Sequence, residues 1–152
     1  METPVLIEPT ELELLYFYKN IILYYEREVN RYPKGFYITN RDFSAFMHRL
    51  GTSVSNVEGT EVIVAPDSFK VRKCSFFIQK RFNKMSILAS LLAHFRDSFA
   101  HGYYSKVKIG EVDYLCLEDY SARGKLSMVA QMPFKQFVPL VELIKKIQKK
   151  EL

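Results

Sequence analysis

The segment from Met85 to His101 constrains the fold more than any other part of this chain. At about 100° per residue, four large apolar side chains fall in one narrow sector of a helical wheel. These four are Leu88, Leu92, Phe95 and Phe99. The spacing predicts an amphipathic helix whose apolar stripe faces a core. Gly102 follows at the position of a helix-terminating glycine.

Two further strips run along the same predicted helix. One is polar, lies opposite the apolar stripe, and comprises Ser90, His94, Asp97 and His101. The other contains three alanines and one cation: Ala89, Ala93, Arg96 and Ala100. Small side chains permit another helix to approach closely, so this alanine strip is compatible with packing against a second copy of the chain. Arg96 and His101 are about 7.5 Å apart in rise and about 140° apart in rotation.

Three other segments have a clear helical pattern. Thr10 and Glu13 have the spacing of a capping box, and the apolar residues of Leu14 to Val29 predict a helix that is central in a bundle or shared with a partner. A second helix is predicted from about Asn40 to Leu50, with Gly51 after its end. The last is predicted from Phe134 to Lys149, with Pro139 in its first turn or at a kink.

The remaining segments are less regular. Glu111 to Leu117 and Lys125 to Met132 are β-prone and predict a hairpin closed by a loop over 118–124. The loop over 51–59 precedes a short β-prone run, Glu61 to Ala65, and the ambiguous segment Ser68 to Phe82 is assigned to a helix. The expected fold is therefore mainly α: one domain over residues 1–152, a helical bundle with a small β-hairpin before the last helix.

Charge is unevenly distributed along the chain. The 152 residues carry a formal net charge of +5, yet residues 1–30 have six acids against Lys19 and Arg27, a net charge of −4. Between Asp67 and Asp97 there is no acid, and seven bases give that stretch a net charge of +7. This segregation allows a basic face for an anionic polymer, or a solvated face that pairs with the acidic first helix.

Several classes of protein are not expected. Cys74 and Cys116 are too few for a disulfide scaffold, and no apolar run approaches the length of a membrane span, so a cytoplasmic location is the default. The six glycines form neither a P-loop nor a dinucleotide fingerprint, and no cluster has the spacing of a zinc site. We therefore expect no metal and no cofactor. Cys74 is interpreted as a buried structural thiol.

The string Arg96-Asp97-Ser98-Phe99-Ala100-His101-Gly102-Tyr103 resembles the RxxxxH signature of the HEPN superfamily. Its ending, Ala100-His101-Gly102, matches a common form of that motif. The spacing of Arg96, His101 and Tyr103 also resembles the RxxxxHxY version in toxins that are paired with nucleotidyltransferases. The resemblance covers eight residues at the end of the predicted helix.

The resemblance implies a metal-independent endoribonuclease that acts as a homodimer, as toxins and anti-phage defence effectors of this type do. His101 would be the general acid or base, Arg96 would bind phosphate, and Asp97 would orient one of them. RNA is the expected substrate, with an antitoxin or a nucleotidyltransferase as a further partner. Substrate contacts or modification are expected at Tyr103, Tyr104, Lys80, Arg81 and Lys84. In the toxin version, Tyr103 would accept nucleotidyl groups from a partner enzyme.

Other interpretations of the same residues remain open. His101 in a last helical turn can simply favour the helix dipole, and Arg96 can simply pair with Asp97 or a glutamate of the first helix. His94 is interpreted as a supporting or interface residue and His48 as structural or exposed. The alternative function is a non-catalytic HEPN-like module that binds RNA, a nucleotide or a partner protein. A third is a helical interaction protein without a phosphate-binding face.

Overall fold

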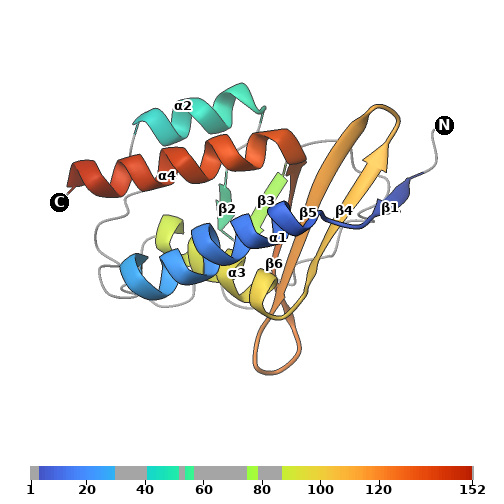
Figure 1. The fold of residues 1–152 in the computed structure, drawn as a ribbon. Helices are drawn as coiled ribbons and strands as arrows, with labels where there is room; N and C mark the ends of the chain where they lie inside the picture. The colour runs from blue at the N-terminus through green and yellow to red at the C-terminus, as the bar shows by residue number, and fades with distance from the viewer. Residues whose placement is uncertain (1–3, 30–40, 52–53, 57–74, 79–86, 152) are drawn as a thin grey trace.

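The computed structural model describes residues 4–29, 41–51, 54–56, 75–78 and 87–151 (Figure 1). The elements are β1 (Val5–Ile7), α1 (Glu11–Phe17), the π-helical segments η1 (Tyr18–Ile22) and η2 (Tyr25–Val29), α2 (Arg41–Arg49), β2 (Val54–Asn56), β3 (Ser75–Ile78), α3 (Ile87–Ala100), β4 (Tyr104–Ile109), β5 (Val112–Tyr120), β6 (Leu126–Pro133), the 3-10 turn η4 (Phe134–Gln136) and α4 (Phe137–Glu151).

The strands form one six-stranded sheet in the order β1–β4–β5–β6–β3–β2. All neighbouring strands are antiparallel except β2 and β3, which are parallel. The prediction of a mainly α bundle was therefore wrong, because the fold is α+β and its helices pack against a sheet (Figure 1). The expected small hairpin is present as β5 and β6, but it is the centre of this sheet instead of an appendage.

Several strands lie where helix or loop was predicted, or where no element was assigned. β3 occupies Ser75–Ile78, within the segment Ser68 to Phe82 that was assigned to a helix. β2 occupies Val54–Asn56, within the predicted loop over 51–59. β4 alternates polar and apolar residues over Tyr104–Ile109, a period of two that is typical of a strand. The β-prone run Glu61 to Ala65 lies outside the described residues.

The other four predicted helices are confirmed, with one difference in the first, whereas β3 replaces part of the helix assigned to Ser68 to Phe82. Thr10 and Glu13 form the predicted capping box, in which the Glu13 N–H donates to Thr10 Oγ1 and the Thr10 N–H donates to Glu13 Oε1. After Phe17, however, the helix widens into the π-helical segments η1 and η2. π-Helical turns are rare and cannot be recognised from an apolar repeat. Pro139 lies in the first turn of α4, where its missing N–H costs nothing.

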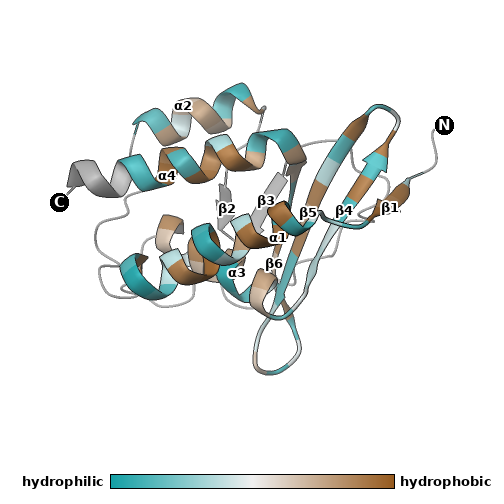
Figure 2. Ribbon diagram, viewed as in Figure 1, coloured by the Kyte–Doolittle hydropathy of each residue, from teal (hydrophilic) through white to brown (hydrophobic). Residues whose placement is uncertain are grey.

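The helices bury their apolar stripes against one face of the sheet. Figure 2 shows hydrophobic and hydrophilic residues alternating around the helices, as amphipathic packing requires. The stripe of α3 is buried as predicted and joins the main core with residues of α1, α4, β5 and β6. At one end of this core, Phe17 stacks on Phe99 with ring centroids 4.3 Å apart, and Phe137 lies 5.7 Å from Phe99.

Glu13 joins the start of α1 to the sheet. Its carboxylate accepts hydrogen bonds from Lys106 Nζ on β4 at 3.0 and 3.1 Å. Lys106 in turn lies 4.5 Å from the centre of the Phe134 ring. Burial opposes ionisation of Glu13, but the hydrogen bonds from Thr10 and Lys106 prevail and lower the pKa of this carboxyl below its usual value of 4.5.

We expect Glu13→Gln to lower the free energy of unfolding by about 1 kcal/mol at pH 7, because glutamine keeps the cap but loses the ion pair. A lowered folded pKa contributes stability that is present above the unfolded pKa and is lost as pH falls through the folded pKa. The difference between wild type and variant should therefore shrink below pH 4.5. Urea unfolding at pH 7 and pH 3 measures it.

The matched control is Glu11→Gln, which removes a charge from the same turn at an exposed position. It should leave the pH dependence of stability close to that of wild type. An equal pH dependence for wild type and Glu13→Gln would show that the contact with Lys106 does not stabilise the ionised form of Glu13 in the folded state.

Candidate functional site

Helix α3 ends in a sharply defined turn that presents His101. The Gly102 N–H donates to Phe99 O at 3.4 Å, and the Tyr103 N–H donates to Ser98 O at 2.8 Å. These two bonds, with Gly102 at a φ of +75°, are the Schellman arrangement of a helix C-terminus. The glycine predicted to end the helix is therefore confirmed in that role. His101 is the last residue before it, and its side chain is exposed.

Two exposed tyrosines lie beside His101. The His101 and Tyr103 rings are nearly parallel, at 21°, with centroids 6.0 Å apart. Tyr103 meets Tyr120 edge-on, with centroids 4.9 Å apart. The Tyr120 hydroxyl donates to Glu118 Oε2 at 2.5 Å, and this bond raises the pKa of Tyr120 to about 12, so the hydroxyl stays protonated at neutral pH.

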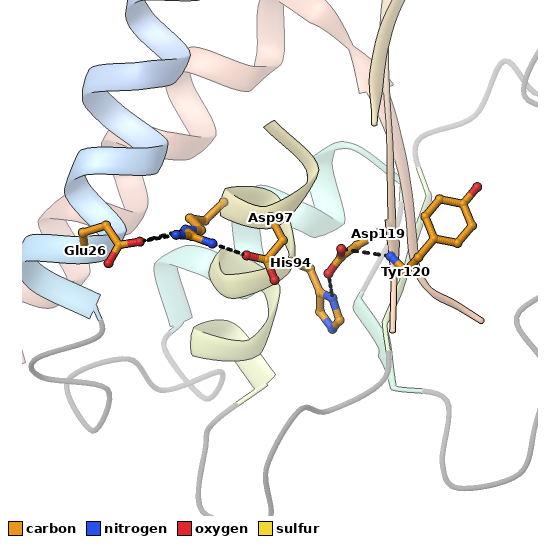
Figure 3. A network of polar contacts seen from close by, with 6 residues as sticks. Glu26, His94, Asp97, Asp119 and Tyr120 are labelled. Carbon is orange, nitrogen blue, oxygen red and sulfur yellow. Dashed lines mark hydrogen bonds and ion pairs between the residues drawn. The ribbon is translucent and has the colours of Figure 1, made fainter. Parts of the chain in front are cut away.

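Arg96 is held between two carboxylates. Its Nη1 donates to Asp97 Oδ1 at 2.7 Å, and its Nε donates to Glu26 Oε1 at 2.9 Å (Figure 3). The bond to Asp97 and the pair with Glu26 raise the pKa of Arg96 above its ordinary value, although burial opposes this. The Arg96 side chain keeps 31% of its surface exposed. Arg96 was expected to pair with Asp97 or with a glutamate of the first helix, and it contacts both.

His94 and Asp119 form a buried pair between α3 and β5. His94 Nδ1 lies 2.8 Å from Asp119 Oδ2, and the other oxygen of Asp119 accepts the Tyr120 N–H at 2.9 Å (Figure 3). The side chains of His94 and Asp119 are 1% and 4% exposed. The interpretation of His94 as a supporting residue agrees with this position, whereas His48 on α2 is exposed.

The expected polar face of α3 was only partly correct. Ser90 and His94 are buried, while His101 is exposed. The polar strip is therefore buried at its N-terminal end and exposed at its C-terminal end. The helix is covered on more than one side, by the sheet and by the first helix (Figure 1). For the same reason Ala89 and Ala93 are buried within the chain itself, and the alanine strip is not available as a seam between two copies.

The other predicted site residues fall into three groups. Asp97 contacts Arg96, so of its two expected tasks the structure supports the orientation of the guanidinium. Tyr104 packs its ring against Phe99 at 5.2 Å, at the edge of the main core, and it stays partly exposed. Lys80, Arg81 and Lys84 lie outside the described residues, as does Cys74.

A small hollow opens beside the end of α3. It has a volume of about 190 Å³ and is lined by Gly102, Tyr103, Tyr104, Ser105, Cys116 and Glu118. Burial raises the pKa of Cys116 to about 11, so its thiol is protonated and a poor nucleophile at neutral pH.

Within the described ranges, no three histidine, cysteine or acidic side chains converge as metal ligands would, and no helix is long and apolar enough to cross a membrane.

Sequence reasoning missed the strand residues of this site. Glu118, Asp119 and Tyr120 were placed in the loop of the hairpin, whereas β5 continues through them. A glutamate of the first helix was named as an alternative partner of Arg96, but the sequence did not identify it as Glu26. The alternation along β5 was the available signal, because Leu115 and Leu117 already mark the inward face that Asp119 continues.

The comparisons with known proteins give no relative for this chain: no protein-family model, no curated protein and no solved structure matches it.

We expect Asp119→Ala to lower the free energy of unfolding by about 3 kcal/mol, because it leaves the buried His94 ring without this partner. Denaturant unfolding at neutral pH is the measurement. Asp113→Ala is the matched control, since Asp113 faces Lys108 at 3.8 Å on the surface of the same strand and should cost less than about 1 kcal/mol. Equal costs for the two variants would show that the buried pair adds nothing to stability.

Proposed function

We propose that this protein is a metal-independent endoribonuclease in which His101 transfers the proton. The observation that carries the proposal is the placement of His101, exposed at a fixed helix end beside aromatic side chains and a hollow. The sequence from Arg96 to Tyr103, with its resemblance to the HEPN ribonuclease signature, supports it further. The proposal depends on this motif and its geometry and not on a helical-bundle fold.

The proposed reaction uses the RNA itself as the nucleophile. The ribose 2′-OH attacks the adjacent phosphorus and gives up its proton, while the 5′-oxygen of the next nucleotide leaves and takes one. The products are a 2′,3′-cyclic phosphate and a 5′-hydroxyl. An imidazole near neutral pH suits either proton transfer. One imidazole cannot be base and acid at the same moment, so the proposal retains a homodimer that supplies His101 twice.

Arg96 is proposed to stabilise charge on the phosphorane. Its guanidinium forms a planar fork that matches phosphate oxygens. The pair with Glu26 occupies that fork, but both side chains are partly exposed, at 31% and 42%. An ion pair of this exposure is worth at most about 1 kcal/mol, so a phosphate can replace Glu26 while Asp97 still holds the guanidinium.

The biological setting belongs to the same proposal. An RNase of this kind would act in the cytoplasm as a toxin or defence effector, restrained by an antitoxin or modified by a nucleotidyltransferase.

The second candidate function is a non-catalytic module that binds RNA, a nucleotide or a protein. The two carboxylates around Arg96 favour it, because together they neutralise the only cation of the motif.

The first test incubates end-labelled RNA with purified protein in EDTA. Wild type should cleave it and leave 2′,3′-cyclic phosphate ends. His101→Ala should lower the rate by about 100-fold or more, since it removes the proton-transfer group. His48→Ala is the control, because His48 is also an exposed histidine in the last turn of a helix. Full activity in His101→Ala, or no cleavage by folded wild type, would contradict the proposal.

The second test asks whether Arg96 binds phosphate. Glu26→Gln frees the guanidinium from one carboxylate, so we expect KM for RNA to fall several-fold with Asp97 still in place. The control is Glu28→Gln, two residues away on η2. Steady-state kinetics at low salt gives the comparison. If Glu26→Gln instead raises KM, then the pair positions Arg96 for a structural purpose only.

A further inference from the structure

The end of the molecule that carries His101 also carries exposed aromatic side chains. Tyr103 and Tyr120 keep 44% and 37% of their surface exposed although their rings are in contact. Tyr103 follows α3 and Tyr120 ends β5. The turn after α3 and the tip of the β5–β6 hairpin lie at the same end of the fold (Figure 1).

These rings are held in place before any ligand arrives. The Tyr103 carbonyl accepts hydrogen bonds from Ser98 Oγ at 2.8 Å and from the Glu118 N–H at 2.9 Å. The bond from the Tyr120 hydroxyl to Glu118 fixes the second ring. A ligand that stacks on Tyr103 and Tyr120 therefore loses little side-chain entropy on binding.

The hollow beside Tyr103 limits the size of what can enter. Its volume of about 190 Å³ is below the range of about 300–1,000 Å³ that is typical of pockets for drug-sized molecules. A single planar ring system fits this size better than an extended organic ligand. Glu118 lies on the rim and offers carboxylate oxygens to the amino groups that nucleobases carry.

Two cations lie at the tip of the same hairpin. Arg123 and Lys125 are exposed in the turn between β5 and β6, and Tyr120 is the last residue of β5 before that turn. Cations that flank exposed aromatic rings are the combination by which proteins bind single-stranded nucleic acid, with bases on the rings and phosphates on the cations.

We propose that Tyr103, Tyr120, Arg123 and Lys125 form a binding surface for an unpaired nucleotide of single-stranded RNA. The base stacks on the tyrosines and the flanking phosphates contact Arg123 and Lys125, which brings the neighbouring ribose to His101. A duplex cannot bind in this way, because its bases are already stacked and paired. Since it concerns the substrate of the site described above, this inference rests on the proposed ribonuclease function.

The test measures binding separately from cleavage. The probe is a fluorescent 12-nucleotide 2′-O-methyl RNA, single-stranded or annealed to its complement, because blocking the 2′-oxygen prevents cleavage. Fluorescence anisotropy should give at least tenfold tighter binding of the single strand. Tyr120→Leu should weaken that binding about 5- to 100-fold, whereas Tyr120→Phe, which keeps the ring but loses the bond to Glu118, should weaken it less. Exposed Tyr18 on η1 supplies the control variant, Tyr18→Leu, which should bind as wild type does.

The cations are tested through salt dependence. The double variant Arg123→Gln/Lys125→Gln should reduce the slope of log K against log salt concentration by about 1.4, at about 0.7 for each phosphate contact to a single strand. Lys146→Gln, at an exposed position on α4, should leave the slope unchanged. Thermal unfolding of each variant confirms that it is folded.

The outcomes separate the two proposals. Equal binding of duplex and single strand, or wild-type binding by folded Tyr120→Leu, overturns the binding surface even if His101-dependent cleavage is observed. The expected binding pattern together with no cleavage of unmodified RNA by wild type overturns the ribonuclease and leaves the surface in place.

Discussion

The buried contact between His94 and Asp119 determines where the other parts of the site lie. It joins the middle of α3 to the end of β5, inside the core, where neither side chain can exchange its partner for water. Because Asp119 also accepts the Tyr120 N–H, the same carboxylate fixes the strand at the point where it leaves the sheet. The spacing between the end of α3 and the end of β5 follows from this contact, and with it the meeting of Tyr103 and Tyr120.

The sequence predicted α3 well because its information is local. Four apolar residues at helical spacing and a glycine after the last turn determine both the core stripe and the exposed position of His101. The same pattern was misleading for Ser90 and His94, which were expected on a polar surface. A polar side chain can be buried when a partner is supplied from elsewhere, and the partner of His94 is 25 residues away, at a position that was assigned to the hairpin loop.

The sheet was underestimated in part because β1 and β3 pair with strands far away in the sequence, whereas β4 was missed although it pairs locally with β5. The β5–β6 hairpin is predictable from two β-prone runs and a turn, and it is present. β1 has three residues and pairs with β4 about a hundred positions later, and β3 pairs with β6 over more than fifty. No property of such short segments indicates their partners. A prediction from periodicity therefore identifies the helices but misses the short strands, and it assigns a helical bundle where the fold is α+β.

The segregation of charge acquires a different meaning in the folded chain. The acidic first helix does not simply oppose a basic surface: Glu13 binds Lys106 and Glu26 binds Arg96, so part of the acid and part of the base neutralise each other inside the molecule. The chain has a net charge of +5, so some basic side chains have no acidic partner close to them in the sequence or in the sheet. Among the described residues, Arg123 and Lys125 meet that condition at the end of the molecule that carries His101. These two cations place positive charge at the end of the molecule where α3 terminates, which is the charge that the proposed binding surface requires.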